Sequence, residues 1–237
     1  RKSEFNTTGR PFYKVDKLAV LINEKSASAS EVIAGAVQDW DKAIIVGEQS
    51  YGKGLVQEQY DLSNGGALRL TIGRYFTPTG RYIQTPFDSD KKVDSSEYST
   101  MLLNRPIIAQ GGITPDILVN WSEEQKETRK IVQQSVVSKA FELILANQLF
   151  AVDSVNLDIL QDDINDFIVR PFSENNLEIS KSSLEIGEAM LKSEIYQQLG
   201  MSTKAIEIIA STDVFIQQAT QSLQKENIFA DFFEIEN

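Results

Sequence analysis

The chain contains neither cysteine nor histidine among its 237 residues. The absence of cysteine excludes disulfides, thiol nucleophiles and thiolate metal sites, although it leaves the cellular compartment undecided. The absence of histidine excludes a Ser-His-Asp triad, a zincin motif and most imidazole metal sites within this polypeptide. Acid–base chemistry near neutral pH must therefore come from a carboxylate, a tyrosine or a lysine whose pKa is shifted by its surroundings.

Long hydrophobic runs are also absent from the chain. No apolar stretch approaches the roughly 20 residues that span a bilayer, and no charged-then-apolar signal segment opens the sequence. The chain begins at Arg1 rather than at a methionine, so we expect further sequence upstream. A hydrophobic content of 41% with 24% charged residues is typical of a globular chain that forms one large domain or two modest ones.

The formal net charge of −11 is carried entirely by residues 121–237, because residues 1–120 contain equal numbers of acidic and basic side chains. This asymmetry predicts two regions with different surfaces. An acidic surface disfavours nucleic acid and anionic membranes as partners. Solubility alone also accounts for the acidic excess.

Residues 1–120 show the pattern of an α/β region. Short apolar runs at 17–23 and 43–47 predict buried strands, and helical spacing after the serine-rich stretch 26–30 predicts a helix between them. A strand–helix–strand unit of this kind favours parallel pairing. Residues 55–62 and 67–76 predict a hairpin around Asn64-Gly65, and 116–120 predict a last strand. We expect residues 86–105 to be irregular.

Residues 121–237 are predicted to be mainly α-helical. Apolar residues recur at three- and four-residue spacing, Arg170-Pro171 suggests a break, and Gly200 suggests a helix stop. The region contains no recognisable catalytic constellation. Its helices are a candidate surface for self-association into a homo-oligomer, and the alternative is that they only cover the α/β region. The expected segments are 122–149, 155–169, 181–199, 203–210 and 212–226.

Ser28 and Lys53 are the candidate catalytic residues. Ser28 stands where a strand turns into a helix, so its N–H and the helix N-terminus are placed to stabilise an oxyanion beside its hydroxyl. Lys53 lies in a glycine-flanked turn, where we expect its ammonium to be held close to another backbone segment, and burial there would lower its pKa toward that of a useful base. A neutral lysine beside a serine is a sufficient nucleophile pair.

Two structural interpretations compete with this one. The stretch from Ser28 to Glu31 also fits a capping box, in which the serine only satisfies helix N–H groups. A lysine between glycines is often an exposed turn residue, and Ser26 and Ser30 compete with Ser28 for the role of nucleophile.

A nucleotide-binding function competes for the same lysine. Residues 47–53 fit the start of a P-loop, G-x-x-x-x-G-K. A P-loop needs serine or threonine at the next position and a helix beginning there, whereas this chain has Gly54 followed by a strand-like run. The sequence therefore disfavours nucleotide binding.

Several linked motifs follow one another in the first half of the chain: Asn23–Ala36, Val46–Gln57, Leu70–Ile72, Thr77–Gly80 and Gly112–Asp116. In order and in spacing, these motifs resemble those of the C-terminal processing, or tail-specific, serine peptidases. The resemblance covers roughly residues 17 to 120. It implies that Ser28 is the nucleophile, that Lys53 is the general base and that Gln57 orients the lysine. It also implies a crotonase-like mixed sheet with helices, a protein or peptide substrate cleaved near an unstructured C-terminus, no cofactor or metal, and a location in the cell envelope or periplasm.

The sequence departs from this family in one respect. Family members carry a PDZ domain and an Asp-Leu-Arg, Gly-Gly motif before the nucleophile, and neither occurs in this chain. We therefore expect a truncated peptidase core. Loss of an oxyanion donor from the glycine motif would cost roughly 10²- to 10³-fold in rate. The fragment by itself is therefore expected to be weak or inactive. The alternative is a non-catalytic binding or assembly module. A covered Lys53 beside Ser28 would favour the enzyme, and a solvent-facing lysine far from every serine would favour the module.

Overall fold

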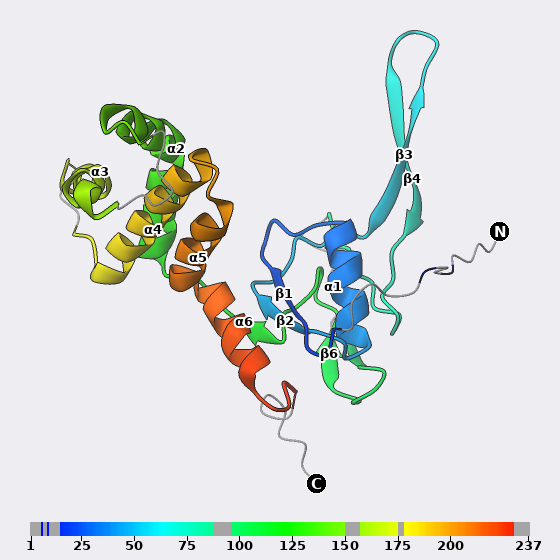
Figure 1. Cartoon of the computed structure of the whole chain (residues 1–237). Coiled ribbons are helices and arrows are strands. Elements are labelled where there is room, and N and C mark those ends of the chain that lie inside the picture. Colours follow the sequence, from blue (N-terminus) through cyan, green and yellow to red (C-terminus); the bar gives the residue numbers. More distant parts are fainter. Residues whose placement is uncertain are drawn as a thin grey trace. The chain divides into compact units, whose positions relative to one another are not determined.

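The structure is a computed structural model that describes residues 6, 9, 15–87, 96–149, 157–174 and 178–229. The chain forms two compact units (Figure 1). The first consists of Arg1–Ile117 together with Ser222–Asn237, and the second consists of Leu118–Gln221. The first unit is a mixture of strands and helix and the second is helical, so a mixed α/β chain with a helical C-terminal part is confirmed.

A strand–helix–strand unit forms the centre of the first unit. Strand β1 (Ala19–Ile22) pairs in parallel with β2 (Ile44–Gly47), and helix α1 (Ala29–Asp39) connects them. The third strand of this sheet is β7 (Ile117–Leu118), which lies on the other side of β2. All four residues of β2 are buried, as expected for a short apolar central strand. The predicted strands, helix and parallel pairing are confirmed.

The apolar core of the first unit lies between this sheet and α1. Ile45 and Ala34 are fully buried there, from β2 and α1 respectively. Ile83 and Ile113, from the loops that follow the hairpin, complete the cluster. The core therefore fixes α1, and with it the residue that precedes the helix, against the sheet.

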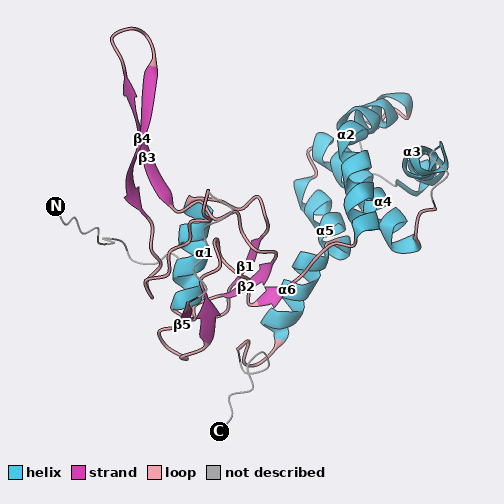
Figure 2. Cartoon of the chain, turned by 180° about the vertical axis from the view of Figure 1, so that it is seen from behind, coloured by secondary structure: helices cyan, strands magenta, loops and turns pink. Residues whose placement is uncertain are grey.

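A long hairpin projects from the first unit (Figures 1 and 2). Strands β3 (Leu55–Asp61) and β4 (Ala67–Arg74) are antiparallel, and all of their residues are exposed or half-buried. Gly65 has a φ of 81°, which a glycine adopts without strain, and the Leu62 carbonyl accepts its N–H. The hairpin predicted around Asn64-Gly65 is confirmed.

A second, smaller pair of strands corrects the prediction for residues 86–105. Strand β5 (Glu97–Ser99) pairs antiparallel with β6 (Pro106–Ile108). The expectation that this whole stretch is irregular is therefore wrong at β5, and residues 88–95 lie outside the described part of the chain. Strands of three residues are too short to show the alternation on which strand prediction depends.

The second unit is a packed group of helices. Helix α4 contacts both α2 and α5, and the core is formed by fully buried side chains such as Ile164, Ile168 and Leu191. None of the helices in the described ranges is both long and apolar enough to cross a membrane. The helices are α2 (Glu123–Ala146), a 3-10 helix η1 (Leu157–Leu160), α3 (Gln161–Glu174), α4 (Lys181–Gln198), α5 (Ser202–Thr212) and α6 (Val214–Gln224).

Two of the predicted helix boundaries can be compared with the structure. Gly200 follows the end of α4 with a φ of 75°, so the predicted stop is confirmed. The predicted break at Arg170-Pro171 is wrong, because α3 continues through Pro171 to Glu174. Proline removes one hydrogen bond and crowds the carbonyl four residues earlier, and this cost is tolerated here in the last turn. The predicted start at residue 155 lies outside the described residues.

Candidate functional site

Ser28 immediately precedes helix α1 and has an unusual backbone conformation. Its φ is 60° and its ψ is −118°, a combination that costs a residue other than glycine roughly 1–3 kcal/mol. Such strain at a strand-to-helix turn is how hydrolases expose a nucleophilic serine. Ser28 is half-buried, so its side chain is not sealed from solvent. The predicted position of Ser28 at the start of a helix is confirmed.

The Glu31 carboxylate organises the turn that contains Ser28. Glu31 lies in the first turn of α1, and its exposed fraction is 0%. The Ser28 N–H donates to its Oε2 at 2.8 Å, which is the Glu31 half of a capping box. The expected capping-box arrangement of Ser28 and Glu31 is thus present at the start of α1. The main chain of the serine is held by the Glu31 carboxylate.

The same carboxylate also binds the loop that carries Lys53. Its Oε1 accepts the Ser50 hydroxyl and the Gly52 N–H, each at 2.6 Å, and its Oε2 accepts the Lys53 N–H at 2.8 Å. Because the Ser28 and Lys53 N–H groups both donate to Oε2 at 2.8 Å, their nitrogens lie no farther apart than twice that distance. The structure thus brings the main chains of the two predicted dyad residues together.

The glycines on either side of Lys53 permit a close approach to residues 83–85. A Cβ atom on Gly52 would lie 1.9 Å from the Thr85 hydroxyl oxygen, and one on Gly54 would lie 2.8 Å from the Gln84 nitrogen. The Thr85 N–H donates to the Gly52 carbonyl at 2.9 Å, and the Gly54 N–H donates to the Gln84 side chain at 2.8 Å. The main chain of this glycine-flanked turn therefore lies against residues 83–85, whereas the expected closeness of the Lys53 ammonium to another segment stays a prediction.

The environment of the Lys53 side chain differs from the expectation. We expected the Lys53 side chain to be buried, because burial favours the neutral amine, but Lys53 is exposed. Its main chain is anchored to Glu31, and β3 then leads away from the core from Leu55 onward, so the described residues do not cover the side chain. The main chain of Lys53 thus lies beside that of Ser28, as expected for the enzyme. Its side chain is exposed, as expected for the non-catalytic module.

Gln57 lies in β3, where it pairs with Thr71 and is exposed. Within the described residues, no hydrogen bond joins Gln57 to Lys53. The ladder is irregular between Val56 and Gln57, because the partner of Val56 is Gly73 and Ile72 is passed over. The structure thus places Gln57 on the strand that follows the lysine, and its role in orienting Lys53 stays a prediction.

The competing serines have different surroundings from Ser28. The Ser26 hydroxyl takes part in a local turn, since it accepts the Asn23 N–H at 3.1 Å. The Ser26 carbonyl accepts the Tyr51 N–H at 3.0 Å, which is a further link between the two loops. Ser30 lies within the first turn of α1 and is exposed. Among these serines, only Ser28 combines a positive φ with the shared Glu31 contact.

One detail of the expected oxyanion site changes. We expected the Ser28 N–H to stabilise the oxyanion, but this N–H donates to Glu31. The next main-chain donor toward the helix is that of Ala29, the first residue of α1. The first N–H groups of a helix have no partner within the helix, and they carry the positive end of its dipole. The helix start therefore still offers a donor to a developing negative charge.

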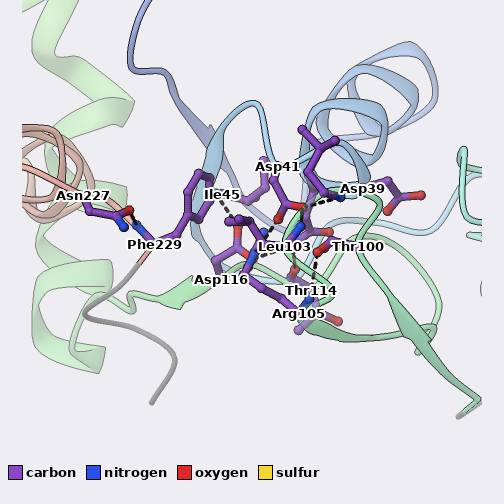
Figure 3. A network of polar contacts seen from close by, with 12 residues as sticks. Asp39, Asp41, Ile45, Thr100, Leu103, Arg105, Thr114, Asp116, Asn227 and Phe229 are labelled. Carbon is purple, nitrogen blue, oxygen red and sulfur yellow. Dashed lines mark hydrogen bonds and ion pairs between the residues drawn. The ribbon is translucent and has the colours of Figure 1, made fainter. Parts of the chain in front are cut away.

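A buried ionic network supports the end of α1 and the strand beside it (Figure 3). Arg105 pairs with Asp41 at 2.6 Å and with Asp116 at 2.9 Å, and Asp116 also accepts the Ile45 N–H. Burial raises the pKa of Asp41, but hydrogen bonds from the Leu103 N–H and from Arg105 outweigh this and hold the pKa below its ordinary value. The network joins the loop around Arg105 to α1 and β2.

The C-terminal end of the described chain belongs to this network region. The Phe229 ring lies under the Arg105 guanidinium, 4.8 Å from the ring centroid (Figure 3). Lys17 also donates to the carbonyls of Leu223 and Lys225, beyond the middle of α6. These contacts account for the grouping of Ser222–Asn237 with the first unit.

The alternative P-loop arrangement is not formed after Lys53. Strand β3 begins at Leu55, where a P-loop would begin the helix that holds phosphate. Across the described ranges, no group of three or more histidine, cysteine, aspartate or glutamate side chains is placed to hold a metal ion.

Part of this chain is similar to known proteins. The family model that matches residues 1–93 is that of peptidase family S41. A carboxy-terminal-processing protease of Bartonella bacilliformis is 57% identical over 67 residues, which are 28% of this chain and 15% of that protein. The chloroplastic carboxyl-terminal-processing peptidase 1 of Arabidopsis thaliana is 38% identical over 122 residues, which are 50% of this chain and 20% of that protein.

A solved photosystem II D1 C-terminal processing protease is 35% identical, with a TM-score of 0.32, and the match covers 44% of this chain and 20% of that one. The chain thus spans no more than a fifth of the length of these relatives. Residues 1–93 are therefore similar to peptidase family S41, and the relatives that match this chain are carboxyl-terminal-processing proteases.

Proposed function

We propose that this chain is the nucleophile-bearing part of a serine endopeptidase that cleaves proteins in or near unstructured C-terminal tails. The observation that carries the proposal is the shared Glu31 carboxylate, which holds the strained Ser28 turn and the Lys53 loop at one point. The family match and the names of the relatives support the same reaction class. A crotonase-like arrangement of the core and a location in the cell envelope or periplasm are part of the proposal.

In this mechanism Ser28 attacks the scissile carbonyl. The neutral Lys53 amine takes the proton from the Ser28 hydroxyl as the new C–O bond forms, and the oxyanion faces the start of α1. The lysine then gives that proton to the leaving amine, so that the peptide C–N bond breaks and an ester with Ser28 remains. A water molecule that loses its proton to the same amine hydrolyses the ester and regenerates the dyad.

The exposure of Lys53 places one requirement on this mechanism. Water stabilises the charged form of an exposed amine, whereas only the neutral form can accept a proton. The amine must therefore lose water before it can act as a base, and we propose that a bound substrate covers it. Gln57, on the strand that follows, is proposed to orient the lysine once it is covered.

The test uses the full-length protein and a peptide with an unstructured C-terminus. Ser28→Ala and Lys53→Ala should each remove nearly all cleavage and leave the fold intact. The double variant should be scarcely worse than either single variant, because residues that act as one unit lose their effect together. Retained turnover in Lys53→Ala would show that another group is the base.

A second candidate function is supported by the surface of α2. Val137, Phe141 and Leu145 are exposed to 59%, 56% and 47%, and they are spaced by four residues along one helix face. A stripe of this kind is typical of a contact between proteins. We propose that it joins two copies of this chain. The solution mass of the full-length protein, compared with that of a variant that carries Phe141→Glu, tests this role separately from cleavage.

A further inference from the structure

The four contacts of Glu31 use the whole acceptor capacity of its carboxylate. An ionised carboxylate has two oxygens with about four acceptor sites and no donor. Oε1 accepts from the Ser50 hydroxyl and the Gly52 N–H, and Oε2 accepts from the N–H groups of Ser28 and Lys53. Helix capping alone requires only one of these contacts. The other three donors come from a loop that is remote in sequence.

The contacts continue from Glu31 into the core. The Ser50 hydroxyl, which donates to Glu31, accepts the Ile113 N–H at 2.7 Å. Ile113 is fully buried, and its carbonyl accepts the Ser50 N–H at 3.1 Å. The position of the Lys53 loop is therefore fixed at both ends, by the core through Ser50 and by α1 through Glu31.

We infer that Glu31 is a positioning residue for the dyad, which holds Ser28 in its strained conformation and the Lys53 loop beside it. This inference rests on the proposed peptidase function. Glu31 does not touch the reacting atoms: it acts through the main chains of the two residues that do. A displacement of about 1 Å between such groups can cost about 10²-fold in rate.

Glutamine at position 31 preserves the shape of the side chain, but it replaces one of the two acceptor oxygens with a donor NH₂ group. Whichever way the amide is turned, its oxygen serves one pair of donors and its nitrogen faces the other pair. Glu31→Gln thus places an NH₂ group opposite two donors, which are the Ser28 and Lys53 N–H groups in one orientation and the Ser50 hydroxyl and Gly52 N–H in the other. Aspartate keeps the charge but is one methylene shorter, so Glu31→Asp should retain the nearby Ser28 N–H and lose the loop.

The experiment measures peptide cleavage and amide hydrogen exchange on the full-length protein. Glu31→Gln should lower kcat by roughly 10- to 100-fold with KM within about twofold, and exchange at Gly52 and Lys53 should be at least about tenfold faster. Glu31→Asp should show fast exchange at Gly52 and Lys53 but not at Ser28. The exposed Glu97→Gln is the matched control, with unchanged kcat and exchange.

The outcomes separate this inference from the proposed function. If Glu31→Gln cleaves within twofold of wild type, or faster because the Ser28 N–H is released for the oxyanion, the positioning role is wrong. If Glu31→Gln fails to fold, the exchange pattern and kcat of Glu31→Asp decide the matter in the same way. A wild-type protein that does not cleave at all would reject the proposed function, and with it a catalytic role for Glu31.

Discussion

Replacing Gly52 with alanine tests whether the Lys53 loop is packed as closely as the structure shows. Gly52 has a φ of 84°, where an alanine costs about 1–2 kcal/mol. The new Cβ would also lie 1.9 Å from the Thr85 hydroxyl oxygen, 2.9 Å from its Cβ and 3.0 Å from its nitrogen. The hydroxyl can rotate away, but the Cβ and the main chain can move only if the two segments separate.

Gly65 offers a matched control for this change. Its φ is 81°, but an added Cβ would meet no atom within 4 Å. Gly65→Ala should therefore lose only the backbone cost of about 1–2 kcal/mol, whereas Gly52→Ala should lose roughly 2–5 kcal/mol because overpacking adds about 1–3 kcal/mol. Replacing glycine with alanine also adds stability by lowering the conformational entropy of the unfolded chain. This gain is the same for Gly52→Ala and Gly65→Ala, so it cancels when their stabilities are compared.

Urea unfolding followed by the fluorescence of Trp40 reports on the first unit. The second tryptophan, Trp121, lies in the helical unit, so all variants should be compared in a Trp121→Phe background. We expect the urea midpoint of Gly52→Ala to lie well below that of Gly65→Ala with a similar slope. Equal losses of stability in the two variants would refute the close packing of the Lys53 loop against Thr85.

Three further predictions follow from the ionic network, the helical core and the α2 stripe. The folded-state pKa of Asp41 is lowered, so its contribution to stability is present above its ordinary pKa of about 3.9 and is lost as pH falls through the lower folded value. In acid unfolding, Asp41→Asn should therefore lose less free energy of unfolding over that pH range than wild type. An identical loss would contradict the lowered pKa. Gly187→Ala would bring a Cβ within 2.8 Å of the Ile168 side chain, so we expect the helical unit to lose about 1–3 kcal/mol in urea unfolding, and an unchanged midpoint would count against this packing. Phe141→Glu should reduce the solution mass measured by light scattering without lowering kcat, and an unchanged oligomeric mass would reject the α2 interface.

The elements of the first unit that the sequence predicts are those with strong local signals. The runs at β1 and β2 are short, apolar and separated by a helical pattern, and Asn64-Gly65 has the backbone preferences of a hairpin turn. Strand β5 carries no such signal, because its order depends on pairing with β6. At Pro171 the prediction is wrong in the opposite way: the local signal predicts a break, but α3 continues through this residue to its end at Glu174.

The sequence predicts the candidate residues Ser28, Lys53 and Gln57, but it does not predict the contacts through which Glu31 joins the Ser28 turn to the Lys53 loop. The spacing from Ser28 to Glu31 indicates a capping box, which is a local contact. That signature contains no information on the donors from Ser50, Gly52 and Lys53, which reach Glu31 only after the loop has folded onto α1. The glycines around Lys53 indicate a close approach of main chains, but they do not determine whether the lysine side chain faces the core or solvent.

The assignment of Ser28 as the nucleophile is tested most directly by covalent labelling. The full-length protein should be treated with a fluorophosphonate, which forms an ester with an activated serine, and the modified residue located by peptide mass spectrometry. We expect one adduct, at Ser28, which is absent after Lys53→Ala although the protein remains folded. An adduct at Ser26 or Ser30, or undiminished labelling of Ser28 without Lys53, would contradict it.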